Sequence, residues 1–222
     1  MNQINLQNGI NPNSPLVRHA TVSHKYQFVL IEIEKVATRS FVRYFKTMHN
    51  NIYQADRVRY LDFPPVLQNY RKLAFIRNPI ERLIAVYKVI IWNATPHLCE
   101  MYLDVHGLKS QMPFADFASY VCDSKDEDCD IHWIPQYWFL KGILNPLIIG
   151  HFDNLNYNLK MALDQYNIPY FDDFPKENQT IKLMHPANPY PDIKISDSTM
   201  IKLKKRYAMD LKLIEKMVEW KN

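Results

Sequence analysis

Glycine is scarce in this sequence. The 222 residues include only four glycines, which are Gly9, Gly107, Gly142 and Gly150. The glycine-rich loops GxxxxGK[ST] and GxGxxG bring the backbone close to phosphate groups, and neither can be written anywhere in this chain. The absence argues against a nucleoside triphosphatase of the Walker type and against a dinucleotide-dependent oxidoreductase.

Metal-binding motifs, disulfide patterns and long apolar runs are missing as well. The cysteines Cys99, Cys122 and Cys129 show no CxxC or Cys/His spacing, so no metal site is predicted. We expect reduced thiols, with a Cys122–Cys129 bridge as the alternative. The N-terminus lacks the basic start and apolar core of a signal peptide. No run reaches the roughly 20 apolar residues that span a bilayer. We therefore expect a soluble, cytoplasmic protein with no integral membrane segment.

The length and charge suit one globular domain that binds anions. The net charge is +4, and 47% of the residues are hydrophobic. Charges of both signs alternate, and there is no long Lys/Arg run, so we expect no nucleic-acid partner. Residues 1–22 are predicted to form a loose, Asn-rich arm, and residues 23–222 a single domain.

The stretch Tyr26–Phe45 combines a strand pattern, a cation and a helix start. An apolar run over residues 28–33 predicts a buried strand. Lys35 and a corner of small residues follow, and a helix is predicted from about Thr38 to position 49. Free N–H groups and the helix dipole favour an anion at such a start. Lys35 and the hydroxyls of Thr38 and Ser40 would strengthen a phosphate site.

A second stretch repeats this arrangement. The apolar run 72–76 ends at Arg77, and Asn78 and Pro79 are a suitable N-cap and first residue for the helix that follows. Ligands of open α/β sheets bind beyond the carboxyl ends of the strands. The two junctions therefore predict two anionic groups bound along one sheet edge.

The rest of the chain completes an α/β pattern. Residues 50–71 look irregular, residues 94–141 look mainly helical, and residues 147–150 form a third strand candidate. A proline-rich loop or lid is predicted over residues 168–195, and a last helix over residues 197–220. We predict a three-layer, P-loop-like α/β fold with a central, mainly parallel sheet flanked by helices.

Five segments of the chain resemble, in order, the motifs of the carbohydrate sulfotransferases (sulfotransferase family 2). They are Glu34–Ser40, Phe75–Tyr87, Pro113–Tyr120 with His132–Gln136, Ile148–Leu155, and Arg206–Leu211. The resemblance covers roughly residues 26–215. It implies transfer of a sulfuryl group from PAPS (3′-phosphoadenosine 5′-phosphosulfate) to a hydroxyl or amine of a carbohydrate or glycoconjugate. Without a membrane anchor, we expect such an enzyme to be bacterial or viral.

The resemblance also assigns residues to the two ends of PAPS. Its first segment implies that the 5′-phosphosulfate is held by Lys35, Ala37, Thr38, Arg39 and Ser40. Lys35 would be the catalytic cation at the bridging oxygen. The second segment implies that Arg77 holds the 3′-phosphate, helped by Arg82 or Lys88, at a site that includes Ala85.

Three residues depart from the family pattern. Glu34 stands where proline is usual, and Arg39 where a small hydroxyl residue is common. Ala85 stands where the family has a serine that helps to bind the 3′-phosphate. The loss of such a hydrogen bond to a charged group costs on the order of 1.5–3 kcal/mol.

A base is needed to take the proton of the acceptor. His132 has the intrinsic proton affinity for this role, and Glu32 is the alternative, because it shares a strand face with Glu34. Glu81 is expected to lie on the helix surface or to form a salt bridge. The aromatic residues at 133–138 would stack on a sugar or pack in the core. His185, Asn188 and Tyr190, in the proline-rich loop, are candidates to cover the adenosine.

Two other functions compete with this prediction. A degenerate family member would bind a glycan or nucleotide without catalysis, and Ala85 and Arg39 favour it. A small nucleotide or sugar kinase is disfavoured by the missing glycine loop. No signature in the sequence identifies the acceptor or an oligomeric state.

Overall fold

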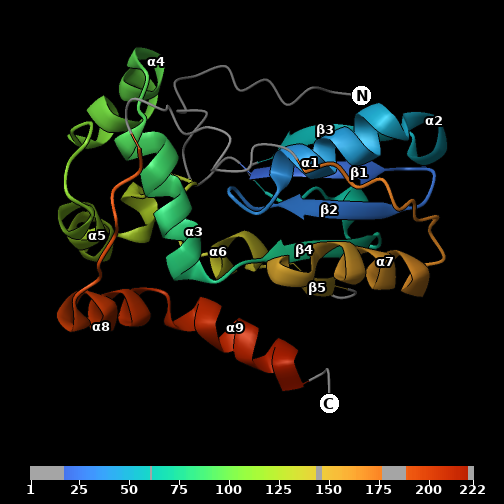
Figure 1. Cartoon of the computed structure of the whole chain (residues 1–222). Coiled ribbons are helices and arrows are strands. Elements are labelled where there is room, and N and C mark those ends of the chain that lie inside the picture. Colours follow the sequence, from blue (N-terminus) through green and yellow to red (C-terminus); the bar gives the residue numbers. More distant parts are fainter. Residues whose placement is uncertain (1–17, 61, 144–146, 177–188, 220–222) are drawn as a thin grey trace.

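One five-stranded sheet organises the molecule (Figure 1). The structure, a computed structural model, describes residues 18–60, 62–143, 147–176 and 189–219. The strands are β1 (Arg18–Ser23), β2 (Phe28–Glu32), β3 (Ala55–Tyr60), β4 (Arg71–Ile76) and β5 (Leu147–His151), in the order β3-β1-β2-β4-β5. β2, β4 and β5 run parallel, whereas β1 is antiparallel to both of its neighbours. The sheet is therefore mixed, and the expected parallel pairing is limited to three strands.

Two of these strands were not predicted. β1 includes residues 18–22, which we assigned to the loose arm, and β3 lies in the stretch 50–71 that looked irregular. β3 is an edge strand in which Asp56, Arg57 and Arg59 are exposed. Charged side chains are common on edge strands, where they oppose pairing with other chains, and they hide the apolar pattern. Residues 1–17 lie outside the described part of the chain.

The central strands match their sequence pattern. All five residues of β2 are buried, as are the last five of β4. Parallel strands covered on both faces read as continuous apolar runs, which is why these two were predictable. The register places Phe75 of β4 beside Gly150 of β5. A Cβ at Gly150 would lie 2.5 Å from the Phe75 ring, so this position requires glycine.

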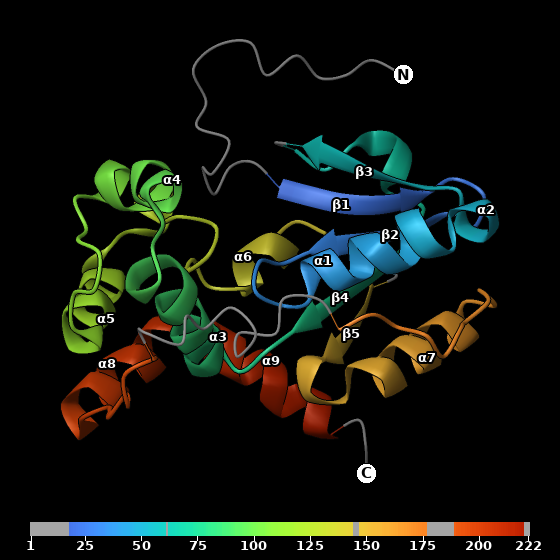
Figure 2. The same ribbon diagram turned by 45° about the horizontal axis from the view of Figure 1, so that its top comes forward.

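Helices lie on both faces of the sheet (Figure 2). On one face lie α1 (Thr38–Val42), its π-helical continuation η1 (Arg43–Met48), α2 (Asn50–Tyr53) and α7 (Leu155–Gln165). The ring of Phe41 in α1 is 4.7 Å from that of Phe75. On the other side α6 (Tyr137–Leu140) packs against α9 (Ala208–Glu219), which also contacts β5. The predicted α/β class is confirmed.

The remaining helices gather beyond the carboxyl ends of β2 and β4, where Figure 1 shows α3, α4, α5 and α8. In chain order the remaining segments are η2 (Pro65–Leu67), α3 (Pro79–Val86), η3 (Tyr87–Trp92), α4 (Pro96–Leu98), η4 (Cys99–Leu103), η5 (Asp104–His106), α5 (Phe114–Asp123), η6 (Asp126–Asp128), η7 (Phe152–Asn154) and α8 (Asp197–Arg206). Asn78 caps α3 by accepting from the N–H groups of Ile80 and Glu81, as predicted. The single last helix was wrong, because α8 and α9 are separated at Tyr207.

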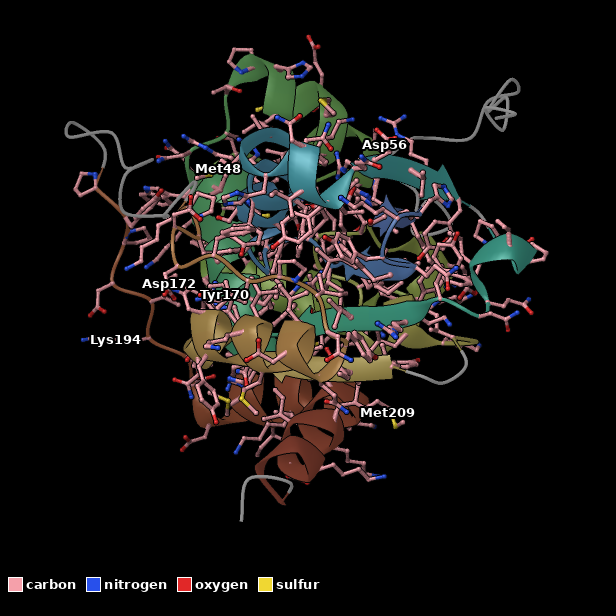
Figure 3. The ribbon with its side chains drawn as sticks, turned by 90° about the vertical axis from the view of Figure 1, so that its right-hand side faces the viewer. Met48, Asp56, Tyr170, Asp172, Lys194 and Met209 are labelled. Carbon is pink, nitrogen blue, oxygen red and sulfur yellow. The ribbon has the colours of Figure 1, made fainter. Side chains whose placement is uncertain are left out.

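The segment after α7 returns along η1. The Tyr44 hydroxyl donates to the carbonyl of Phe171 at 3.0 Å, and the N–H of Phe171 donates back at 2.7 Å. Tyr170 and Asp172 lie on this segment, next to α7 (Figure 3). These two hydrogen bonds hold the segment just before residues 174–176, which line the cavity described below.

Two general expectations can be compared with this fold. Cys99, Cys122 and Cys129 are all unpaired, so the alternative Cys122–Cys129 bridge is not formed. Within the described ranges, no helix has both the length and the apolar character that crossing a bilayer requires.

Candidate active site

A cavity of about 790 Å³ opens at the carboxyl ends of the three parallel strands. Each of these strands runs directly into residues that line it: 34–40 after β2, Arg77 after β4, and 152–157 after β5. Eight of the nine predicted site residues meet here, namely Lys35, Ala37, Thr38, Arg39, Ser40, Arg77, Ala85 and His132. Two junctions that are far apart in sequence therefore share one cavity.

The loop between β2 and α1 adopts a shape that usually needs glycine. Lys35 has a φ of 65° and Ala37 a φ of 56°, so both lie in the left-handed region. Each such residue costs about 1–2 kcal/mol when it carries a side chain. Alternation of left- and right-handed residues turns successive N–H groups toward one concavity, which binds anions. The missing glycines therefore do not prevent a phosphate-binding turn.

The start of α1 adds to this anion site. Ala37 precedes the helix, and its side chain cannot cap the first-turn N–H groups, which lack acceptors within any α-helix. The helix runs on through η1, so its dipole extends over residues 38–48. Thr38 Oγ1 donates to the carbonyl of Ile33 at 2.9 Å. The hydroxyl proton of Thr38 is thus engaged. We expect Thr38 to offer its backbone N–H group to a bound anion, rather than the hydroxyl that was predicted.

Lys35 is a cation held in a partly buried place. Burial lowers the pKa of Lys35 from its ordinary 10.5 to about 8. The neighbouring Glu34 carboxylate raises this pKa, whereas the charges of Arg39 and Arg82 lower it. A lysine whose charge is made costly by burial gains strongly from an incoming anion.

Arg77 forms a second cationic point. Its guanidinium lies 4.7 Å from the centre of the Phe152 ring, and its Nε is 3.6 Å from the Glu81 carboxylate. This ion pair is the salt bridge expected for Glu81. Nε is buried, and it has no hydrogen-bond partner within the described ranges. Because Arg77 lines the cavity, its guanidinium gives the wall a cation that fits an anionic ligand. Ala85, also on the wall, offers no side-chain donor.

The backbone of Arg77 is held by residues whose role was not predicted. The Gln136 amide accepts from the N–H of Arg77 at 3.0 Å and donates to its carbonyl at 2.7 Å. Asp210, fully buried, accepts from the backbone N–H groups of Gln136 and Tyr137, both at 2.8 Å. Sequence resemblance marked Gln136 and Asp210 only as parts of motifs. Their function is to fix the loop that presents Arg77.

Arg82 does not line the cavity, and its predicted contact with phosphate is not supported by its position. Its side chain is buried and donates to three backbone carbonyls: Glu34 at 2.8 Å, Ile134 at 2.8 Å and Ile131 at 2.9 Å. All three nitrogens of the guanidinium are therefore engaged. Arg82 ties the loop that carries Lys35 to the loop that carries His132.

His132 lies on the cavity wall, on the loop between η6 and α6. Its Nδ1 is 2.6 Å from the Asp130 carboxylate, and the Tyr102 ring packs edge-on at 4.9 Å between centroids. Burial raises the pKa of Tyr102 to about 12. Asp130 was not predicted, because it read as the end of an acidic loop. Its place two residues before His132 was the available signal.

The alternative base, Glu32, does not line the cavity. Its carboxylate accepts from Thr21 at 2.8 Å and from Arg57 at 2.7 Å. Burial raises the pKa of Glu32, and the adjacent Arg57 opposes that change. Both oxygens are occupied within the sheet, so Glu32 is a structural residue.

Other predictions near the site have mixed outcomes. Trp133 is fully buried, and Trp138 stacks on Arg18 at 4.4 Å, so core packing describes both. His185 and Asn188 lie outside the described residues. Tyr190 packs against Lys88, at 5.4 Å from its Nζ. In the described ranges no group of three or more His, Cys, Asp or Glu side chains is arranged to hold a metal ion.

Comparison with known proteins places these features in a family. A family model described as "Sulfotransferase family" matches residues 18–215. Carbohydrate sulfotransferase 14 of Mus musculus is 25% identical over 205 residues, covering 78% of this chain and 52% of that protein. The proteins of the same name from Homo sapiens and Danio rerio are each 24% identical, covering 78% and 74% of the chain and 52% of each protein. The chain thus spans about half the length of these curated relatives. No solved structure matches it significantly.

Proposed function

Because the chain belongs to the sulfotransferase family, we propose that it transfers the sulfuryl group of PAPS to a hydroxyl or amine of a carbohydrate or glycoconjugate. The observation that supports this most directly is the shared cavity, which brings Lys35, Arg77 and His132 to one space. A cation for the leaving group, a cation for a second phosphate and a candidate base are the groups that this reaction requires. We also propose that the turn between β2 and α1 binds phosphate in the manner of a P-loop.

At the donor end, two anion sites match the two ends of the cosubstrate. The turn at Lys35 and Ala37 and the start of α1 would hold the 5′-phosphosulfate. Arg77, whose guanidinium lines the cavity, would hold the 3′-phosphate. As in phosphoryl transfer, positioning and stabilisation of charge would provide most of the catalysis.

In the chemical step, an acceptor oxygen or nitrogen attacks sulfur while the bond from sulfur to the bridging oxygen breaks. Lys35 neutralises the negative charge that grows on the leaving 5′-phosphate oxygen. His132 takes the proton that the acceptor loses. The products are the sulfated acceptor and adenosine 3′,5′-bisphosphate.

A degenerate, noncatalytic member of the family is the second candidate. Ala85 favours it, because this wall position offers no hydroxyl to the 3′-phosphate. Arg39, which also lines the cavity, is the other departure in its favour. Binding of the bisphosphate without transfer to any acceptor would establish this alternative.

The test begins with calorimetry using adenosine 3′,5′-bisphosphate and ATP. We expect tight binding of the bisphosphate, and preference for ATP would refute the proposal. Lys35→Ala and Arg77→Ala should each weaken that binding, whereas Lys204→Ala, at an exposed position on α8, is the matched control. Transfer from labelled PAPS to a panel of saccharides, lipids and peptides then identifies the acceptor.

A further inference from the structure

Within the part of the chain that the structure describes, the carboxylate of Asp130 forms two hydrogen bonds, both with His132. One oxygen, Oδ1, lies 2.6 Å from Nδ1 of the ring and 2.9 Å from the backbone nitrogen of His132. Asp130 is only 1% exposed. A buried carboxylate is retained where its negative charge is used, because burial without a partner costs several kcal/mol.

The position of this loop does not depend on the carboxylate alone. The backbone carbonyl of Asp130 accepts from the N–H groups of Trp133 and Ile134, at 3.1 and 3.0 Å. Arg82 binds the carbonyls of Ile131 and Ile134. Main-chain contacts therefore hold the loop at several points besides the carboxylate, and the Asp130 side chain is the group that also contacts the His132 ring.

An acceptor at Nδ1 also selects the tautomer of the ring. A carboxylate can only accept, so Nδ1 carries the proton and the lone pair lies on Nε2. The edge of Tyr102 packs against the ring at 4.9 Å and limits its rotation. Because His132 lines the cavity, Nε2 is the nitrogen left for a group bound there.

We propose that Asp130 is a positioning residue that makes His132 the base of the reaction. It holds the Nδ1–H tautomer, aims Nε2 at the acceptor and stabilises the imidazolium that forms when the acceptor proton moves to Nε2. The inference rests on the proposed function. The same pairing of a buried carboxylate with a catalytic imidazole operates in serine proteases.

The first test reads the tautomer and requires no acceptor. Long-range ¹H–¹⁵N correlation spectra, recorded at alkaline pH and assigned with His132→Gln, should show an Nδ1–H ring in the wild-type chain. In Asp130→Ala the signals should move to the Nε2–H form. Asp128→Asn, at the exposed last position of η6, should leave them unchanged. An Nε2–H ring in the wild type, or no change in Asp130→Ala, overturns the inference.

The second test is kinetic and uses PAPS with the saccharide that the panel identifies. Asp130→Asn, which keeps the shape and an acceptor oxygen, and Asp130→Ala should each lower kcat on the order of 10–100-fold, with the KM for PAPS within about twofold. In a His132→Ala background, Asp130→Ala should have no further effect. Two outcomes contradict the inference. One is a kcat of the double variant that lies below that of His132→Ala by the full factor seen for Asp130→Ala alone. The other is an unchanged kcat in both Asp130 single variants.

Calorimetry with adenosine 3′,5′-bisphosphate separates this inference from the proposed function. All Asp130 variants should bind the bisphosphate as the wild type does, because Asp130 does not line the cavity. If the wild type fails to bind it, the proposed function falls. If binding persists and only the Asp130 results disagree, the function stands and the positioning role falls.

Discussion

The pH dependence of anion binding should follow the protonation of Lys35. Burial lowers the pKa of this amine to about 8, so its charge is lost as the pH rises through that value. Roughly 90% of the lysines are charged at pH 7 and roughly 10% at pH 9. If only the charged form binds the 5′-phosphate well, the apparent Kd should rise about tenfold between these pH values, or about 1.4 kcal/mol.

Calorimetry with adenosine 3′,5′-bisphosphate measures this effect in two ways. The first is the Kd at pH 7 and pH 9. The second is proton uptake, obtained from titrations in buffers of different ionisation enthalpy. A bound anion raises the pKa of a lysine, so binding at pH 9 should take up nearly one proton, about 0.9 at most.

The control is Lys35→Arg, because a guanidinium keeps its charge throughout this range. In this variant the Kd should change little between pH 7 and pH 9, whatever its absolute value. A wild-type Kd that is the same at both pH values would refute the reasoning. So would an equal rise in Lys35→Arg, because another group would then be titrating.

Three further outcomes are expected. Arg77→Ala should weaken binding of the 3′,5′-bisphosphate at least about tenfold, because a charged hydrogen-bond partner is lost. Calorimetry should show that the affinity of this variant for adenosine 5′-phosphate is unchanged. Equal losses for both nucleotides would contradict a role at the 3′-phosphate. Ala37→Gly should raise the free energy of unfolding in urea by up to about 1 kcal/mol, because glycine relieves the left-handed strain. Ala162→Gly, within α7, should instead lower it by about 1 kcal/mol, and a loss in both variants would argue against strain at position 37. Asp210→Ala leaves the N–H groups of Gln136 and Tyr137 without their acceptor and should lower the free energy of unfolding by about 2–5 kcal/mol. Asp210→Asn keeps an oxygen and should lose less, so an equal loss in both would contradict this account.

The sequence was sufficient for the parts of the site that lie on buried parallel strands. β2 and β4 are continuous apolar runs, and each is followed within three residues by a cation that lines the cavity, Lys35 or Arg77. Local composition and the rule on strand ends therefore placed both groups correctly. β1 and β3 were missed because their polar and charged residues face the sheet edge or pair across strands, as Arg57 does with Glu32.

Side-chain partners were harder to predict than the position of the site. Arg82 follows Arg77 by five residues and was assigned to the same phosphate, yet its side chain donates to three carbonyls. Spacing in a helix predicts a face and not a partner. Asp130 was overlooked for a related reason: nothing in a run of acidic residues distinguishes the one that is buried against a histidine.

The Arg82 tie has a consequence for how this site can change over generations. Its three acceptors are main-chain oxygens of residues 34, 131 and 134, which every amino acid provides. Ile131 and Ile134 are core residues, but residue 34 lines the cavity, and a substitution there can alter charge and shape around the reacting groups while the spacing between the two loops is preserved. Glu34, which stands where proline is usual in the resembling proteins, is one such substitution. The side chain at such a position can therefore change while the hydrogen bonds of Arg82 keep the two loops at the same spacing.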